Sequence, residues 1–118
     1  MDYFTIASGG DAQDFGDSLF QTSQGGGLAS PTRGCFMGGN TSPANINAIE
    51  YITIATTGNS ANFGDLTAVI QAQSTASNAV RGLSMGGVGL TNVINYFAIS
   101  TLGNANDFGD LTVSRSAL

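Results

Sequence analysis

The sequence contains no His, no Trp and no Lys, and Cys35 is its single cysteine. Without His, the chain lacks the most common general base and metal ligand. One cysteine excludes an intramolecular disulfide and a thiolate metal cluster. Without Lys, and with three basic residues in total, it lacks the clustered cations that nucleic-acid binding needs. We therefore expect no enzyme, no cofactor and no nucleic-acid partner.

Charge and long hydrophobic runs are also scarce. Only 9% of the residues are charged, so the net charge of -5 describes an uncharged surface rather than a strongly acidic one. No apolar run approaches the roughly 18 residues of a membrane span, and residues 1–6 lack the basic segment of a classical signal peptide. Neither membrane association nor secretion is expected. The 42% hydrophobic content is enough for the core of one small domain.

Three segments of the chain resemble one another. They begin at Tyr3, Tyr51 and Tyr96, which are 48 and 45 residues apart, and read YFTIASGGDAQDFGDSL, YITIATTGNSANFGDLT and YFAISTLGNANDFGDLT. A second block, R-G-x-x-M-G-G, begins at Arg33 and again at Arg81, 48 residues later. The copies differ by three residues between Gly87 and Ile94, which predicts a loop there. The chain is therefore built from repeats.

Each repeat predicts four short strands. In the middle of the chain we expect them at 51–56, from 63 to about 70, at about 71–77 and at 81–85, with Ile52 and Ile54 on one face of the first. The pairs at 10–11, 58–59 and 103–104 are Gly-Asp or Gly-Asn, which predict tight reversals because these residues tolerate left-handed backbone. No apolar stripe continues at helical spacing. The fold class is all-β.

Four strands in 45–48 residues are typical of a β-propeller blade. A single blade cannot bury both faces of its sheet, so blades must stack. The chain divides into a half blade at 1–20 and blades at 21–67 and 68–115, which is too few for a ring of four to eight blades. We expect homo-oligomerisation, as a dimer or trimer, to close the ring; otherwise the chain is a fragment of a longer reading frame. A parallel β-solenoid is the structural alternative.

Several motifs resemble known repeats. The Gly-Gly pairs at 38–39 and 86–87 resemble the strand ends of kelch-like blades, where Phe15, Phe63 and Phe108 would take the packing role of the kelch Trp. The phrase Y-x-T-I-A-x-x-G-N-x-x-D-F-G-D-L-T, followed by R-G-x-x-x-G-G, is similar to repeats in phage virion and tail proteins. The resemblance implies a structural or receptor-binding component of a phage particle, assembled in the host cytoplasm. Its partners would be copies of itself, other virion proteins or a cell-surface glycan.

Residues that recur in the repeats are expected to be structural. We predict that Arg33 and Arg81 pair with the Asp of a Phe-Gly-Asp turn as ties between strands, rather than bind an anionic sugar or phosphate. The paired aspartates would be Asp17, Asp65 and Asp110. The tyrosines Tyr3, Tyr51 and Tyr96 are expected to pack between repeats, with stacking on sugars as the alternative. The segment 104–110 has closely spaced oxygen ligands but lacks the Glu of a calcium loop, so we predict a polar turn and no metal site.

Segments that differ between repeats are better candidates for binding, because packing does not fix them. These are 21–32, 40–45 and 71–78, all rich in Asn, Gln, Ser and Thr. The candidate ligand-binding residues are Asn40, Thr41, Ser42, Asn45, Gln71 and Asn78. They suit a structural or receptor-binding protein or, alternatively, a lectin-like module. A sialidase-like hydrolase would need clustered arginines in addition to a Tyr nucleophile, and two repeat arginines are too few.

Overall fold

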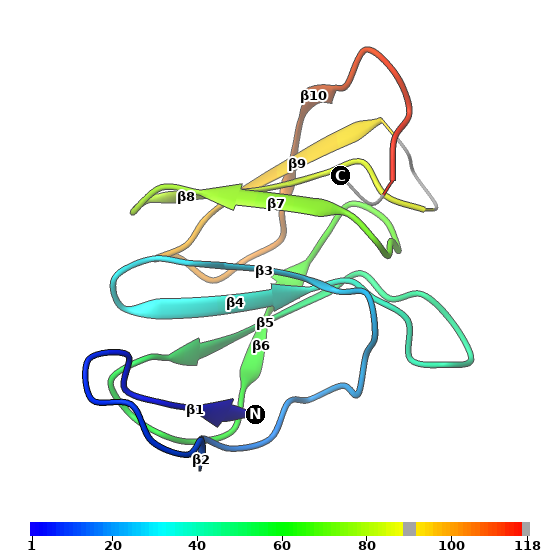
Figure 1. Ribbon diagram of the computed structural model, residues 1–118. Coiled ribbons are helices and arrows are strands. Elements are labelled where there is room, and N and C mark those ends of the chain that lie inside the picture. Colours follow the sequence, from blue (N-terminus) through cyan, green and yellow to red (C-terminus); the bar gives the residue numbers. More distant parts are fainter. Residues whose placement is uncertain (89–91, 117–118) are drawn as a thin grey trace.

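The computed structural model describes residues 1–88 and 92–116, which form three antiparallel sheets and no helix. The first sheet pairs β1 (Asp2–Tyr3) with β2 (Gln13–Asp14). The second joins β3 (Gly26–Ala29), β4 (Arg33–Met37), β5 (Ala48–Thr53) and β6 (Ala61–Asp65) in chain order. The third joins β7 (Ser74–Ser77), β8 (Arg81–Met85), β9 (Val93–Ala98) and β10 (Asn106–Asp110) in the same order. The three sheets follow one another in space as they do in the chain (Figure 1).

The all-β prediction is confirmed, and the parallel solenoid is wrong because every strand pair in the described residues is antiparallel. The strand predicted at 81–85 is found as β8. The strand expected at 63–70 ends at Asp65, and two residues later Thr67 N leaves the second sheet and donates to Asn95 Oδ1 of β9 at 3.2 Å. The strand expected at 71–77 shortens to β7. The predicted loop between Gly87 and Ile94 lies partly outside the described residues.

The Gly-Asp and Gly-Asn pairs are not the reversals that the sequence predicted. The chain reverses three to five residues earlier, where the amides of Ser8, Thr56 and Thr101 each donate to the carbonyl three residues before, at 3.3, 3.2 and 3.4 Å. Gly58 has a positive φ of 158°, whereas Asn59 does not adopt positive φ. The asparagine is needed for another reason, because its side chain accepts a hydrogen bond from the preceding repeat, as described below.

A register shift places one phenylalanine as the extra residue in each four-stranded sheet. Glu50 pairs with Asn62 and Ile49 with Gly64, so Phe63 is inserted between them, and Phe108 is inserted between β9 and β10 in the same way. Each of these rings packs edge-on against a tyrosine of its own repeat. The centroid distances are 5.7 Å for Tyr3–Phe15, 5.9 Å for Tyr51–Phe63 and 5.8 Å for Tyr96–Phe108. β5 and β9 bring Tyr51 and Tyr96 beside the inserted ring of the adjacent strand, and Tyr51 also packs against the core between the second and third sheets.

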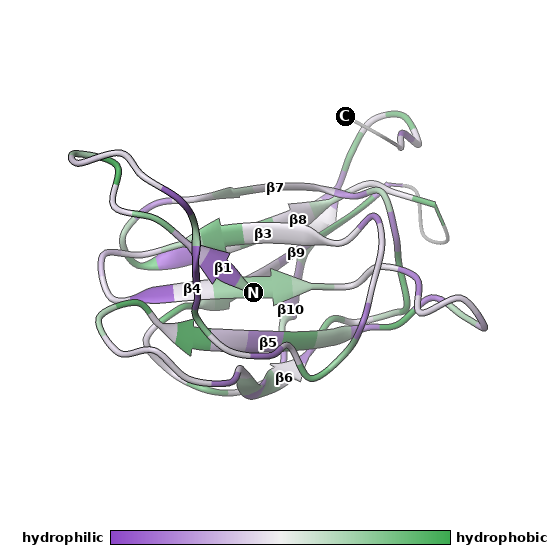
Figure 2. Ribbon diagram, turned by 60° about the horizontal axis from the view of Figure 1, so that its bottom comes forward, coloured by the Kyte–Doolittle hydropathy of each residue, from purple (hydrophilic) through white to green (hydrophobic). Residues whose placement is uncertain are grey.

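The hydrophobic core lies between the two four-stranded sheets. Cys35, Met37 and Ile49 of the second sheet are at most 2% exposed, and they pack in one cluster with Phe97 of β9 and with Ile99, which follows β9. Hydrophobic residues are coloured green in Figure 2, where β5 carries green at both of its ends. Phe63 crosses this boundary to contact Phe97 with ring centroids 5.2 Å apart. Burial raises the pKa of the Cys35 thiol to about 11, while the nearby Arg33 guanidinium acts in the opposite direction.

The predicted ion pairs between arginine and aspartate are wrong. The guanidinium of Arg33 lies 4.8 Å from the centroid of the Tyr51 ring, and Arg81 lies at the same distance from Tyr96. Arg33 Nη1 also donates to the carbonyl of Ile99, which follows β9, at 2.9 Å. Because the tyrosine stands on the adjacent strand, the cation–π contact is within direct reach of each arginine. Over 1–88 and 92–116, no arginine forms an ion pair with an aspartate.

Candidate functional site

The repeated Phe-Gly-Asp motif joins each sheet to the next one. Gly58 N donates to the carbonyl of Phe15 at 2.8 Å, and Ser60 N donates to the carbonyl of Asp17 at 2.9 Å. The backbone N–H of Asp17 donates in return to Asn59 Oδ1 at 2.9 Å. We call this set of three hydrogen bonds the Phe-Gly-Asp contact.

The same contact joins the second sheet to the third. Gly103 N donates to the carbonyl of Phe63 at 3.0 Å, and Ala105 N donates to the carbonyl of Asp65 at 2.8 Å. Asp65 N donates to Asn104 Oδ1 at 3.0 Å. A Cβ atom on Gly64 would overlap the carbonyl oxygen of Gly103, so glycine is required by close backbone approach. The residues that recur in every repeat therefore hold sheets together.

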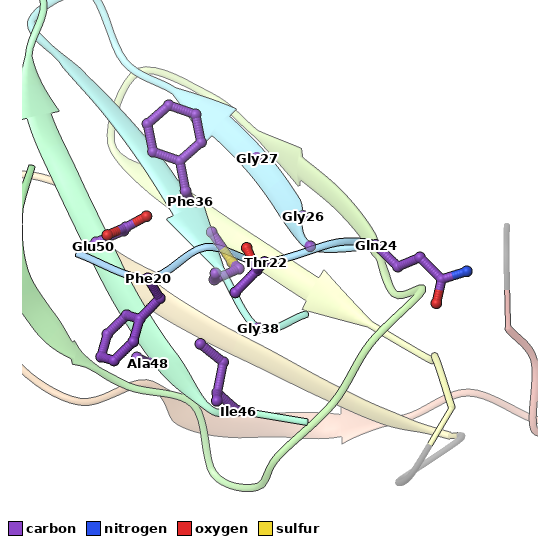
Figure 3. A pocket seen from close by; sticks show the side chains of 12 residues that line it. Phe20, Thr22, Gln24, Gly26, Gly27, Phe36, Gly38, Ile46, Ala48 and Glu50 are labelled. Carbon is purple, nitrogen blue, oxygen red and sulfur yellow. The ribbon is translucent and has the colours of Figure 1, made fainter. Parts of the chain in front are cut away.

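A cavity of about 350 Å³ opens on the second sheet, where the segment around Phe20–Gly26 passes over β4 and β5 (Figure 3). This size lies within the range of small-molecule pockets. Its lining residues are Phe20, Thr22, Gln24, Gly25, Gly26, Gly27, Phe36, Met37, Gly38, Ile46, Ala48 and Glu50.

Glu50 is the charged side chain of this cavity. It stands on β5 and is 7% exposed. Its Oε2 accepts hydrogen bonds from Leu19 N and from Ser60 Oγ, both at 2.8 Å. Both bonds use one oxygen, so Oε1 can accept a hydrogen bond from a ligand. The carboxylate is thus fixed in place by two donors from neighbouring segments.

Two aromatic rings lie beside this carboxylate. Strand alternation places Phe36 on the face of β4 opposite to Cys35 and Met37, which belong to the core. Phe36 is 37% exposed and Phe20 is 40% exposed. The cavity therefore combines partly exposed ring faces with an oriented acceptor, as Figure 3 shows.

The predicted ligand-binding residues are used mainly to close their own loops. Asn40 Nδ2 donates to Asn45 Oδ1 at 2.8 Å, Ser42 N donates to Asn40 Oδ1 at 2.7 Å, and Thr41 Oγ1 donates to the carbonyl of Ala44 at 3.1 Å. The same loop lies beside the segment that leads to Gln71, because Gly39 N donates to the carbonyl of Ile70 at 2.7 Å.

Asn78 does not lie with the other candidates. Its Oδ1 accepts from Val80 N at 2.8 Å and from Arg81 N at 2.7 Å, so it shapes the turn between β7 and β8. That turn follows β7, whereas Gln71 precedes it, so the two residues lie near opposite ends of the strand (Figure 1). The structure therefore divides the predicted set, and none of its six residues lines the cavity.

The predicted variable stretch 21–32 does contribute Thr22 and Gln24 to the cavity. Sequence reasoning missed Phe36 and Glu50. A signal was present at both positions, because their counterparts one repeat later are Ser84 and Asn95, and Glu50 is the only Glu of the sequence.

Comparison with known proteins finds no family model that matches the chain and no match among curated proteins. In the part of the chain that the structure describes, no three or more Cys, Asp or Glu side chains gather as metal ligands would. Nor is any helix within residues 1–88 and 92–116 long and apolar enough to cross a bilayer.

Proposed function

We propose that the protein is a non-enzymatic structural or receptor-binding component of a phage particle, tail-associated, whose four-stranded sheets are blades of a β-propeller that copies of the chain close into a ring. The observation that carries this proposal is the Phe-Gly-Asp contact, found between both successive pairs of sheets. Consecutive four-stranded antiparallel sheets joined face to face by a repeated contact are what a propeller requires.

Repeated and variable residues have different roles, and this supports a protein that presents a binding site on a fixed scaffold. Residues shared by the repeats hold the sheets together, while the cavity takes Phe36 and Glu50 from positions that differ between repeats. A rigid scaffold with variable side chains at one site suits recognition without chemistry. The placement in a virion rests on the resemblance of the repeat phrase to phage tail repeats.

Labelling of particles tests this proposal. Antibodies raised against the chain should decorate the tails of virus particles whose genome encodes it, and the purified protein should compete with those particles for adsorption to the host. Antibody signal confined to unassembled material, together with undiminished adsorption, would contradict it.

A lectin-like module is the second candidate, and the cavity favours it. The Phe36 and Phe20 rings offer apolar surfaces for the faces of sugar rings, and the fixed Glu50 carboxylate accepts hydrogen bonds from hydroxyl groups. The variant Phe36→Ser removes one ring and introduces the residue that the chain has at the counterpart position, Ser84. On a glycan array this variant should lose binding.

The matched control is Val80→Ser, which removes an apolar side chain that is 64% exposed and does not line the cavity. It should bind as the wild type does. Binding by the wild type that Phe36→Ser leaves unchanged would rule out the cavity as the sugar site, and an array without signal would rule out the lectin.

A further inference from the structure

The last Phe-Gly-Asp motif has the same sequence as the earlier ones but a different environment. Phe63 is 3% exposed, whereas Phe108 is 55% exposed. A Cβ on Gly64 would overlap a neighbouring carbonyl, while a Cβ on Gly109, at φ +147°, would meet nothing within 4 Å. The outer side of the third sheet thus exposes a surface whose counterpart on the second sheet is buried against the third sheet.

This exposed surface is apolar, and we call it the C-terminal face. Its residues Leu83, Met85, Ile94 and Phe108 are partly or largely exposed. Their counterparts in the second sheet are Cys35, Met37, Ile49 and Phe63, which are all at most 3% exposed and form the core with the third sheet.

The first repeat exposes the complementary half of the contact, which we call the N-terminal face. It contains Phe4 and Ile6, which are 63% and 91% exposed, whereas their counterparts in the last repeat, Phe97 and Ile99, are 2% and 1% exposed. It also contains residues 10–12, Gly-Asp-Ala, which align with Gly-Asn-Ser at 58–60 and Gly-Asn-Ala at 103–105. All three residues are exposed.

We propose that the N-terminal face of one copy binds the C-terminal face of a second copy and repeats the Phe-Gly-Asp contact between chains. In that contact, Gly10 N of the second copy donates to the carbonyl of Phe108, and Ala12 N donates to the carbonyl of Asp110. The backbone N–H of Asp110 donates to the carboxylate of Asp11 in the second copy. Phe108 packs on Phe4 of the second copy, as Phe63 packs on Phe97 within the chain.

The occupant is a second copy because the interface already exists inside the chain. The three hydrogen bonds of the Phe-Gly-Asp contact form between the first and second sheets and again between the second and third. The two unmatched faces are the ends of that series and lie at opposite ends of the stack (Figure 1). Pairing them is heterologous, so it leads to a ring or a filament. This inference deepens the proposed ring closure and rests on it.

The proposed contact between chains differs from the two internal contacts at one position, and this difference affects its affinity. Asp11 stands where the internal contacts have Asn59 and Asn104, so a second carboxylate lies near that of Asp110. Like charges repel, and salt screens that repulsion. The contact between chains is therefore weaker than the internal contacts and strengthens with ionic strength.

Sedimentation velocity over a range of protein concentrations tests the contact on the whole chain. The wild type should associate. Gly109→Ala should abolish association, because the new Cβ would overlap the Gly10 carbonyl of the second copy as a Cβ on Gly64 would overlap that of Gly103. Asp11→Asn restores the internal sequence and should tighten association on the order of threefold.

The matched control is Gly58→Ala, which has a similar φ of +158° and open space around the new Cβ but lies away from both end faces. It should still associate. If Gly109→Ala does not fold, Phe108→Asp at the largely exposed ring position serves instead, with the same expected loss. Association that neither end variant changes would overturn the contact while leaving ring closure by another surface. A monomeric wild type at millimolar concentration would overturn both.

Discussion

Close backbone approach at Gly64 makes a quantitative prediction about stability. Gly64 has φ +157°, and a Cβ there would overlap the carbonyl oxygen of Gly103. Gly58 has φ +158° and nothing within 4 Å of its Cβ position. The substitutions Gly64→Ala and Gly58→Ala therefore carry the same backbone penalty, about 1–3 kcal/mol, and differ in the overlap alone.

The overlap cannot relax cheaply, because the carbonyl belongs to a segment held by hydrogen bonds. Gly103 N and Ala105 N donate to the carbonyls of Phe63 and Asp65, and Asn104 Oδ1 accepts from Asp65 N. Overpacking costs about 1–3 kcal/mol, and each hydrogen bond that the segment gives up adds about 0.5–1.5 kcal/mol. We expect Gly64→Ala to lower the free energy of unfolding by about 2–4 kcal/mol more than Gly58→Ala does.

Urea unfolding of both variants at one protein concentration measures this difference. Both keep the end faces intact, so any association contributes equally to the two curves. The m-values should agree with that of the wild type, since neither substitution changes the surface exposed on unfolding. Equal midpoints for the two variants would refute the argument that the sheets approach too closely for a side chain.

Two further predictions concern side chains in unequal environments. Phe63→Ala should lower the free energy of unfolding by about 3–5 kcal/mol. Phe108→Ala removes a ring that is 55% exposed and should lower it by less than about 1.5 kcal/mol under monomeric conditions. Similar losses for the two variants in thermal or urea unfolding would contradict the assigned burial. Because burial raises the pKa of Cys35 from 9.0 to about 11, the folded state holds the thiol proton more tightly than the unfolded state. Stability from this group is therefore complete below pH 9 and declines as the pH rises towards 11, by roughly 2–3 kcal/mol. The difference between wild type and Cys35→Ala, followed by urea unfolding from pH 8 to 11, isolates the effect, and a constant difference would exclude it.

Much of the fold could be predicted from local pattern. The strand Arg81–Met85 has the predicted limits, since the following Gly-Gly pair marks its end, and the first copy of this block forms the strand Arg33–Met37. The strand after Asn62 was predicted too long. Beyond Asp65 the chain leaves the second sheet, and Thr67 N bonds to the Asn95 side chain in the third sheet, a contact 28 residues distant that no local pattern encodes.

The candidate site was harder to predict because it depends on which sheet lies beside which. Asn40 and Asn78 lie in segments with the composition of binding loops, but their side chains form hydrogen bonds within their own turns. Glu50 looks like an ordinary strand residue until Leu19 and Ser60, from other segments, are seen to hold its carboxylate. An alignment of whole repeats indicates that Glu50 is a variable position, since its counterpart is Asn95.

The repeats also separate what local sequence determines from what a neighbour determines. Residues 62–67 and 107–112 read NFGDLT and DFGDLT, and both place phenylalanine as the inserted residue beside a tyrosine. Yet Phe63 is 3% exposed and Phe108 is 55% exposed, because only Phe63 has a further sheet beside it. A half-exposed ring and a glycine at φ +147° with open space around it contribute little to the stability of a single chain. Both features would form contacts if the Gly-Asp-Ala segment at residues 10–12 of a second copy bound there. They therefore favour an assembly in which the last repeat of one copy contacts the first repeat of the next.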